Sequence, residues 1–315
     1  MHLLKKGDFG KFVESLISRH EVIAPVKTDI VRFKVLEKGD GAEGKVVFDS
    51  PLYSAKEFFL PIKEPFYYFK KGKICESMED GKNARKRIFF MNRCDINGVH
   101  RNDLILLDDP VDPYYREKRD NAILVEIPCV QSKRCSCVDI GLIDCYDLRI
   151  IDPGQDNPNY VLDAATEKGR HMIKEMYLSA SYLPKQDIPS HQARNIAAEN
   201  KEVWEDYGKD CFSCSACTAV CPTCTCFTID GFMKLNGEEG HLYRELASCQ
   251  LPEFTKVAGG FVFRKDRGSR GKQRIHCKFQ YFREKYGHNR CVGCGRCNEA
   301  CPVSINIFEY FGRLK

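Results

Sequence analysis

The cysteine run Cys211-Phe-Ser-Cys214-Ser-Ala-Cys217-Thr-Ala-Val-Cys221-Pro222 decides how the C-terminal third of this chain folds. Its spacing, C-x2-C-x2-C-x3-C-P, is repeated in Cys291-Val-Gly-Cys294-Gly-Arg-Cys297-Asn-Glu-Ala-Cys301-Pro302. Bacterial-type ferredoxins use this spacing: three thiolates of a run hold one [4Fe–4S] cluster, and the fourth cysteine binds the neighbouring cluster. The sequence therefore predicts two cubane clusters that lie close together.

The exchange of fourth cysteines between the two runs fixes the expected ligands. We expect the first set to be Cys211, Cys214, Cys217 and Cys301, and the second set to be Cys291, Cys294, Cys297 and Cys221. Pairs of cysteines with C-x2-C spacing also bind structural zinc. Two runs of four cysteines, each ending in Cys-Pro, favour [4Fe–4S] clusters over structural zinc sites.

The composition is that of a soluble globular protein with two or three domains: 315 residues, of which 43% are hydrophobic and 30% charged. No apolar run is long enough to span a bilayer, and the first residues are too short an apolar stretch for a signal peptide, so we expect a cytoplasmic protein without membrane contact. In that compartment, 18 cysteines indicate metal ligands rather than disulfides. The formal charge of +5 would fall to about −1 with three bound clusters of about −2 each.

We expect an α+β multidomain chain in three parts. Residues 1–85 form an N-terminal α+β region, with a helix over 8–20 that Asp8 caps and short β-strand patterns over 21–73. Residues 86–188 form an α/β domain. Residues 189–315 form a helical, bacterial-type two-[4Fe–4S] ferredoxin-like domain, interrupted by a long insertion at 222–290.

The predicted α/β domain contains three short apolar runs of buried-strand type and then a strand that turns into a helix. The runs are 87–91, 122–127 and 146–151, and the strand and helix span 159–182. Two prolines at 183–190 mark a linker. A helix over 190–207 then leads into the first cysteine run.

Four cysteines of this α/β domain follow predicted strand ends, where such scaffolds place their sites. Cys94 follows the first strand, Cys129 follows the second, and Cys135 and Cys137 lie in the next loop. They could bind a third cluster, with Cys145 able to replace any one of them. Buried cysteines without ligands explain the pattern equally well.

The insertion carries a dense basic stretch between residues 264 and 290, with aromatic residues among the basic ones. Such a stretch is compatible with a nucleic-acid surface, but compensation of cluster charge or docking of an acidic redox partner explains it better. No G-x-G-x-x-G or P-loop motif is present. No arrangement of catalytic residues stands out, so we expect no catalytic residue in this chain.

Several strings, spread almost end to end, resemble the beta subunit of cytoplasmic sulfhydrogenases (NiFe hydrogenase/sulfur reductase) and the closely related electron-transfer subunit of anaerobic sulfite reductase. Beyond the two cysteine runs, the strings that carry the resemblance are Ala24-Pro-Val-Lys27, Lys56-Glu-Phe-Phe-Leu-Pro61, Arg93-Cys94-Asp95, Asp112-Pro-Tyr-Tyr115, Cys135-Ser-Cys137, Thr166-Glu-Lys-Gly169, Cys224-Thr-Cys226, Ser248-Cys249, Ala258-Gly-Gly260, Gln273-Arg-Ile275 and Lys278-Phe279.

The resemblance implies an iron–sulfur electron-transfer subunit with three [4Fe–4S] clusters and no catalytic centre of its own. The third cluster then falls on Cys94, Cys129, Cys135 and Cys137. The implied partners are the small and large NiFe hydrogenase subunits with a flavin/NAD(P)-binding reductase subunit, or sulfite reductase subunits instead, and no nucleic acid. Six cysteines have no role in this scheme and could lie around the clusters or hold a further one: Cys75, Cys145, Cys224, Cys226, Cys249 and Cys277.

Two other functions compete with electron transfer. The chain could itself reduce sulfur or polysulfide at an exposed cysteine or cluster face. Alternatively, it could be a zinc-dependent interaction or nucleic-acid module. Iron and acid-labile sulfide distinguish the zinc module from an iron–sulfur protein.

Overall fold

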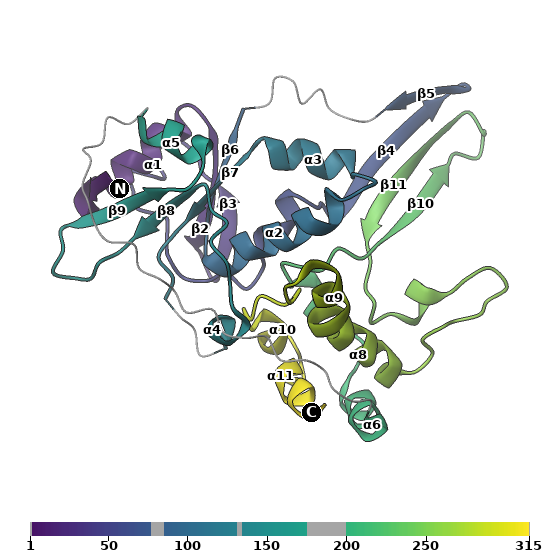
Figure 1. The fold of residues 1–315 in the computed structure, drawn as a ribbon. Helices are drawn as coiled ribbons and strands as arrows, with labels where there is room; N and C mark the ends of the chain where they lie inside the picture. Colours follow the sequence, from purple (N-terminus) through teal and green to yellow (C-terminus); the bar gives the residue numbers. More distant parts are fainter. Residues whose placement is uncertain (1, 77–84, 131–133, 175–199, 315) are drawn as a thin grey trace.

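The computed structural model describes residues 2–76, 85–130, 134–174 and 200–314 (Figure 1). Its main element is a seven-stranded sheet with the order β1-β9-β8-β7-β6-β2-β3. The four strands β2, β6, β7 and β8 are parallel, while β1, β3 and β9 pair antiparallel to their neighbours. The strands are β1 (His2–Lys5), β2 (Glu21–Lys27), β3 (Val31–Val35), β6 (Arg87–Met91), β7 (Ala122–Glu126), β8 (Leu148–Ile151) and β9 (Asn159–Ala164).

Helices cover both faces of this sheet, which is why its central strands are apolar on both sides. Helices α1 (Phe9–Ile17) and α5 (Glu167–Lys174) pack on one face, together with Ile88 and Phe90 of β6. Helices α2 (Arg93–Leu106) and α3 (Pro113–Asp120) pack on the other face with Phe89 and Met91. Successive side chains of a strand point to opposite faces, so β6 contributes to both cores.

The three strands predicted at 87–91, 122–127 and 146–151 are confirmed as β6, β7 and β8. The helix predicted over 8–20 is confirmed as α1, but Asp8 makes no capping hydrogen bond and accepts one from Lys11 Nζ at 2.9 Å instead. The prediction for 159–182 corresponds to β9 and α5, and its remainder lies outside the described residues. The linker at 183–190 also lies outside them.

Strands on either side of residue 85 belong to the same sheet, because Val22 of β2 pairs with Ile88 of β6. The parts 1–85 and 86–188, which the sequence patterns predicted as separate regions, therefore share one sheet and its two cores.

A second, four-stranded antiparallel sheet has the order β10-β11-β4-β5. It joins β4 (Lys63–Lys70) and β5 (Lys73–Glu76) of the N-terminal region to β10 (Phe227–Met233) and β11 (Glu239–Leu246) of the insertion. Figure 1 shows that this sheet, which we call the arm, extends away from the rest of the molecule. The sequence predicted β-structure around β4 and β5 but not their partners.

Apart from β10 and β11, the C-terminal third is mainly helical and has its own core of α6, α8 and α11 side chains, against which cluster-motif cysteines pack. The part of the helix predicted over 190–207 that is described lies in α6; its start lies outside the described residues. The helices are α6 (Lys201–Asp210), α7 (Ala216–Ala219), α8 (Arg267–His276), a π turn (Cys277–Tyr281), α9 (Phe282–Tyr286), α10 (Arg296–Glu299) and α11 (Ile307–Gly312); α4 (Cys137–Ile140) lies in an earlier loop. None of the helices formed by the described residues is long and apolar enough to cross a membrane.

Candidate metal centres

The two cysteine runs have the same backbone conformation. Ser213 and Ser215 of the first run have φ values of 56° and 66°, and the equivalent Gly293 and Gly295 have φ values of 66° and 70°. In each run this turn lets a backbone N–H point at the first thiol: Ser213 N lies 3.3 Å from Cys211 Sγ, and Gly293 N lies 3.4 Å from Cys291 Sγ. Donors that face sulfur in this way stabilise metal-bound thiolates.

Only the second run requires glycine for space as well as for φ. A Cβ on Gly295 would lie 1.9 Å from the carbonyl oxygen of Arg134, and one on Gly293 would lie 2.6 Å from that of Ser136. Ser136 N also donates a 2.7 Å hydrogen bond to Gly293 O. The second run therefore packs directly on the loop that carries Cys135 and Cys137.

We expect Ser215→Gly to stabilise the protein by about 1 kcal/mol, because a left-handed conformation costs a non-glycine residue about 1–2 kcal/mol. Ser215 Oγ is also buried and has no hydrogen-bond partner among the described residues, so its removal leaves nothing unpaired. Urea unfolding of the anaerobic protein measures this change. The matched variant Gly295→Ser should destabilise the protein by about 3 kcal/mol, because its side chain clashes with the Arg134 backbone. Equal effects of the two changes would contradict the conclusion that only the second run needs glycine for space.

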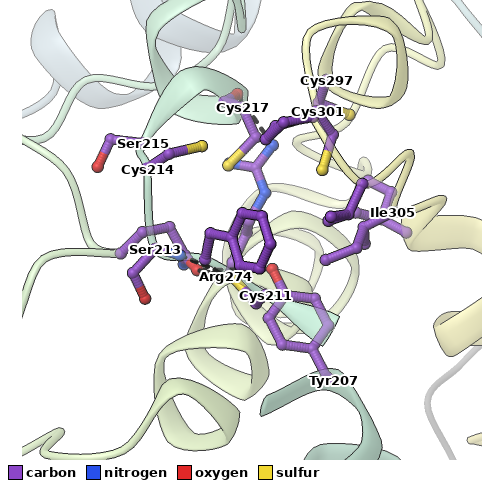
Figure 2. A pocket seen from close by; sticks show the side chains of 15 residues that line it. Tyr207, Cys211, Ser213, Cys214, Ser215, Cys217, Arg274, Cys297, Cys301 and Ile305 are labelled. Atoms are coloured by element: carbon purple, nitrogen blue, oxygen red, sulfur yellow. Dashed lines mark hydrogen bonds between the residues drawn. The ribbon is translucent and has the colours of Figure 1, made fainter. Parts of the chain in front are cut away.

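The first predicted cysteine set surrounds one hollow. Cys211, Cys214, Cys217 and Cys301 all line one hollow, and Figure 2 shows Cys301 across it from Cys214. The other lining is mostly apolar and includes Tyr207, Ile305 and Ile307; Cys297 of the second set also lines it. A largely apolar hollow with four thiols suits a [4Fe–4S] cluster, whose ligands are thiolates and whose potential depends on burial.

The second predicted set lies next to the first. Cys291 interacts electrostatically with Cys294, Cys297 and Cys221, and Cys217 of the first set interacts with Cys297. Burial raises the pKa of the Cys217 thiol and of the Cys294 thiol to about 11. These thiols are neutral in the metal-free chain near neutral pH, so binding of a cluster must release their protons.

The third set lies at the carboxyl ends of β6 and β7, as the sequence predicted. Cys94 is in the first turn of α2 and Cys129 follows β7, while Cys135 Sγ and Cys137 Sγ are 3.0 Å apart. Cys137 interacts electrostatically with Cys135, Cys94 and Cys129. The structure therefore brings the four thiols together, although they come from separate segments.

Cys145, the alternative ligand, lies elsewhere. Its sulfur is 3.8 Å from the carbonyl oxygen of Ile143, and its electrostatic neighbours are charged side chains such as Arg101 and Glu126 rather than the four thiols. No three His, Cys, Asp or Glu side chains in the described part of the chain are placed to bind a single metal ion.

Sequence reasoning missed the ion pair that joins the second and third sets. Arg296, which is fully buried, donates from Nη1 and Nη2 to Asp95 at 2.8 and 2.6 Å, and from Nε to Pro51 O at 2.7 Å. Arg296 also interacts electrostatically with Cys94 and Cys294. Neither residue could be paired from sequence, because they are about two hundred positions apart.

Part of the basic stretch in the insertion points inward. Arg270, Arg274 and Lys278 are buried, and Lys278 Nζ lies 3.3 Å from Cys221 Sγ. Burial opposes the charge of Lys278, but the thiols of Cys221 and Cys224 raise its pKa above the usual range. These three side chains are not available to a nucleic acid, and their position supports charge compensation.

The fold and the cysteine sets define an iron–sulfur protein with a ferredoxin-like C-terminal part. Residues 210–305 match the family described as 4Fe-4S dicluster domain, which confirms this class of cofactor for the C-terminal part. Over 333 aligned positions the chain is 30% identical to sulfhydrogenase 2 subunit beta of Pyrococcus furiosus, and the alignment covers 98% of this chain and 96% of that relative. The chain therefore belongs to the sulfhydrogenase beta-subunit family, as the resemblance indicated, and is an iron–sulfur electron-transfer subunit. No solved structure matches it.

Proposed function

We propose that this protein relays electrons through three [4Fe–4S] clusters between a NiFe hydrogenase and a flavin/NAD(P)-binding reductase subunit, inside a cytoplasmic sulfhydrogenase-type complex. The clusters, when bound, supply one-electron redox chemistry. The observation that carries this proposal is the continuity of the three cysteine sets. Cys94 of the third set interacts with Cys294 of the second set, and Cys217 of the first set interacts with Cys297 of the second.

In this proposal the order of the relay is third, second and first set. Both ends reach the surface, because Cys129 at one end and Cys214 at the other are exposed. The second set has no exposed cysteine: Cys221, Cys291, Cys294 and Cys297 are all partly buried. Two exposed ends support entry of electrons on one side of the protein and exit on the other.

The arm supports the assembly of this chain with sister subunits. Its outer strand β10 is exposed along its whole length; Phe232 and Met233 are 54% and 61% exposed, and Leu235 in the following turn is fully exposed. A concentrated set of large apolar side chains in contact with water marks protein–protein contact. We propose that a sister subunit of the complex covers this part of the arm.

Replacing Phe232 and Leu235 together by Ser should abolish co-purification with the sister subunits, because the contact loses its apolar anchors. Phe232 and Leu235 lie at the β10–β11 turn, the end of these strands opposite Cys226 and Cys249, so the iron content should be unchanged. Co-purification from the native host, with iron analysis of the same sample, checks both points. Intact complex containing the double variant would exclude the arm as the contact.

The cofactor content is tested on the anaerobically purified chain. We expect equal amounts of iron and acid-labile sulfide, with at least about twelve atoms of each per chain. Dithionite should also produce EPR signals of reduced clusters. Zinc without sulfide would defeat the proposal and favour the zinc-dependent module.

A sulfite reductase is a second candidate partner, and co-purification of the neighbouring subunits distinguishes it from a hydrogenase. Direct polysulfide reduction is the other candidate function. It requires that the isolated, cluster-loaded subunit consumes polysulfide when a low-potential reductant is supplied. Absence of consumption in that sample would exclude it.

A further inference from the structure

Three cysteines outside the three sets come together in the insertion, and a fourth, Cys277, lies beside Arg290, which also faces Cys224 and Cys226. Cys224 and Cys226 follow the first run, Cys249 follows β11, and Cys277 begins the π turn after α8. The thiols of Cys226 and Cys249 are hydrogen-bonded to each other, and Cys226 interacts electrostatically with Cys224. We call these four residues the insertion cysteines. Three separate segments supply them, so the tertiary structure rather than a local motif gathers them.

Three cations point at this group. Arg274 Nη1 lies 3.6 Å from Cys224 Sγ, and Arg290 Nη1 lies 3.1 Å from Cys277 Sγ. Lys278 Nζ lies 3.3 Å from Cys221 Sγ, and Cys221 is itself hydrogen-bonded to Cys224. Arg290 interacts electrostatically with Cys277, Cys224 and Cys226 together.

Among the described residues, these cations have no carboxylate partners; Arg274 and Lys278 are buried and Arg290 is partly buried. Arg274 and Lys278 are each 2% exposed, and the ion pairs found in the described part of the chain include none of Arg274, Lys278 and Arg290. Arg274 Nε also has no hydrogen-bond partner within that part of the chain. A buried charge is costly unless an opposite charge compensates it, so the site requires anions that the described side chains do not supply as carboxylates.

The three proposed cluster sets account for only part of this positive charge. Lys278 contacts Cys221 of the second set, and Arg274 interacts with Cys217 and Cys297 of the sets as well as with Cys224. Arg290, in contrast, directs Nη1 at Cys277 and interacts with Cys224 and Cys226, which belong to no set. A neutral thiol is a weak acceptor for a guanidinium group. A metal-bound thiolate is anionic and forms the stronger, charge-assisted type of hydrogen bond.

Space for a bound group is available beside two of the insertion cysteines. Cys224 and Cys226 line a cavity of ≈ 310 Å³, together with Lys56, Glu57, Thr218 and Ser248. Lys56 is 7% exposed and donates to Thr218 O at 3.2 Å, so a fourth basic side chain lies at the wall of this cavity.

We propose that Cys224, Cys226, Cys249 and Cys277 hold a fourth iron–sulfur cluster, with Arg274, Lys278 and Arg290 compensating its negative charge. Binding consumes iron and sulfide and releases the four thiol protons to solvent. Its contact with the relay is the pair Cys221 and Cys224, next to the second set. The inference adds a site to the three-cluster relay and does not depend on the identity of the partner subunits.

Native mass spectrometry of the anaerobic full-length chain, with iron and sulfide analysis, tests the proposal. We expect about sixteen iron atoms in the wild-type chain, and a loss of about a quarter of them in Cys249→Ser and in Cys226→Ser. Cys145→Ser is the matched control, since it also removes a partly buried thiol but should lose no iron. The variants should keep the EPR signals of the remaining clusters.

Three outcomes would overturn the fourth cluster: about twelve iron atoms in the wild-type chain, unchanged iron in Cys249→Ser, or zinc in place of iron at this site. The wild-type count needs no variant, so a variant that fails to fold leaves the test intact. None of these outcomes affects the three-set relay, whose own test is the loss of a cluster on mutation of the second set.

Discussion

Cys294→Ala should remove one cluster and reduce electron flow through the protein to the background rate. The second set lies between the other two: Cys294 interacts with Cys94 of the third set, and Cys297 interacts with Cys217 of the first. We expect the cluster to be lost with one of its four thiolates, so the iron content should fall by about four atoms per chain. The relay then lacks its middle step.

Iron analysis and the rate of electron transfer between a reduced dye and the partner hydrogenase measure this effect. The seven-stranded sheet contains none of the lost contacts, so its circular dichroism signal should persist. Cys145→Ala is the control, because its thiol contacts the backbone of Ile143 rather than a cysteine set. Normal electron flow in a Cys294→Ala sample that has lost its cluster would refute the linear relay.

Arg296→Met should destabilise the protein by about 3–5 kcal/mol, the cost of leaving one partner of a buried ion pair uncompensated. Arg296 and Asp95 have side chains that are 0% and 1% exposed. Arg296 also binds Pro51 O, so a single guanidinium connects the second cysteine run to α2 and to the N-terminal region. Its loss should weaken the contact between the ferredoxin-like part and the sheet.

Urea unfolding of the anaerobic protein gives the size of this effect. Arg313→Met is the matched control: its ion pair with Asp206 is about half exposed, at 46% and 40%, and such surface pairs contribute about 0–1 kcal/mol. The double variant Asp95→Leu, Arg296→Met should recover part of the loss, because no charge is then left buried alone. A loss below about 1 kcal/mol in Arg296→Met would show that the pair is not buried in solution.

The agreement between the sequence and the structure is closest where the interactions are local. The spacing of the cysteines in each run restricts them to one tight turn, and the structure shows the same positive φ at Ser213, Ser215, Gly293 and Gly295. Strands β6, β7 and β8 were predicted because continuous apolar runs suit strands covered on both faces. The positions of Cys94 and Cys129 just after strand ends followed directly from the predicted ends of β6 and β7.

The tertiary structure alone decided the long-range arrangement. It paired β4 with β11 across about one hundred and seventy residues, placed β2 beside β6 in one sheet, and joined Arg296 to Asp95. Only the tertiary structure shows that Cys145 lies apart from the third set, and that the insertion cysteines lie near the cations Arg274, Lys278 and Arg290. Sequence spacing fixes only what a few consecutive residues can reach, whereas partners far apart in the chain meet because burying apolar surface and pairing buried charges favour one overall packing.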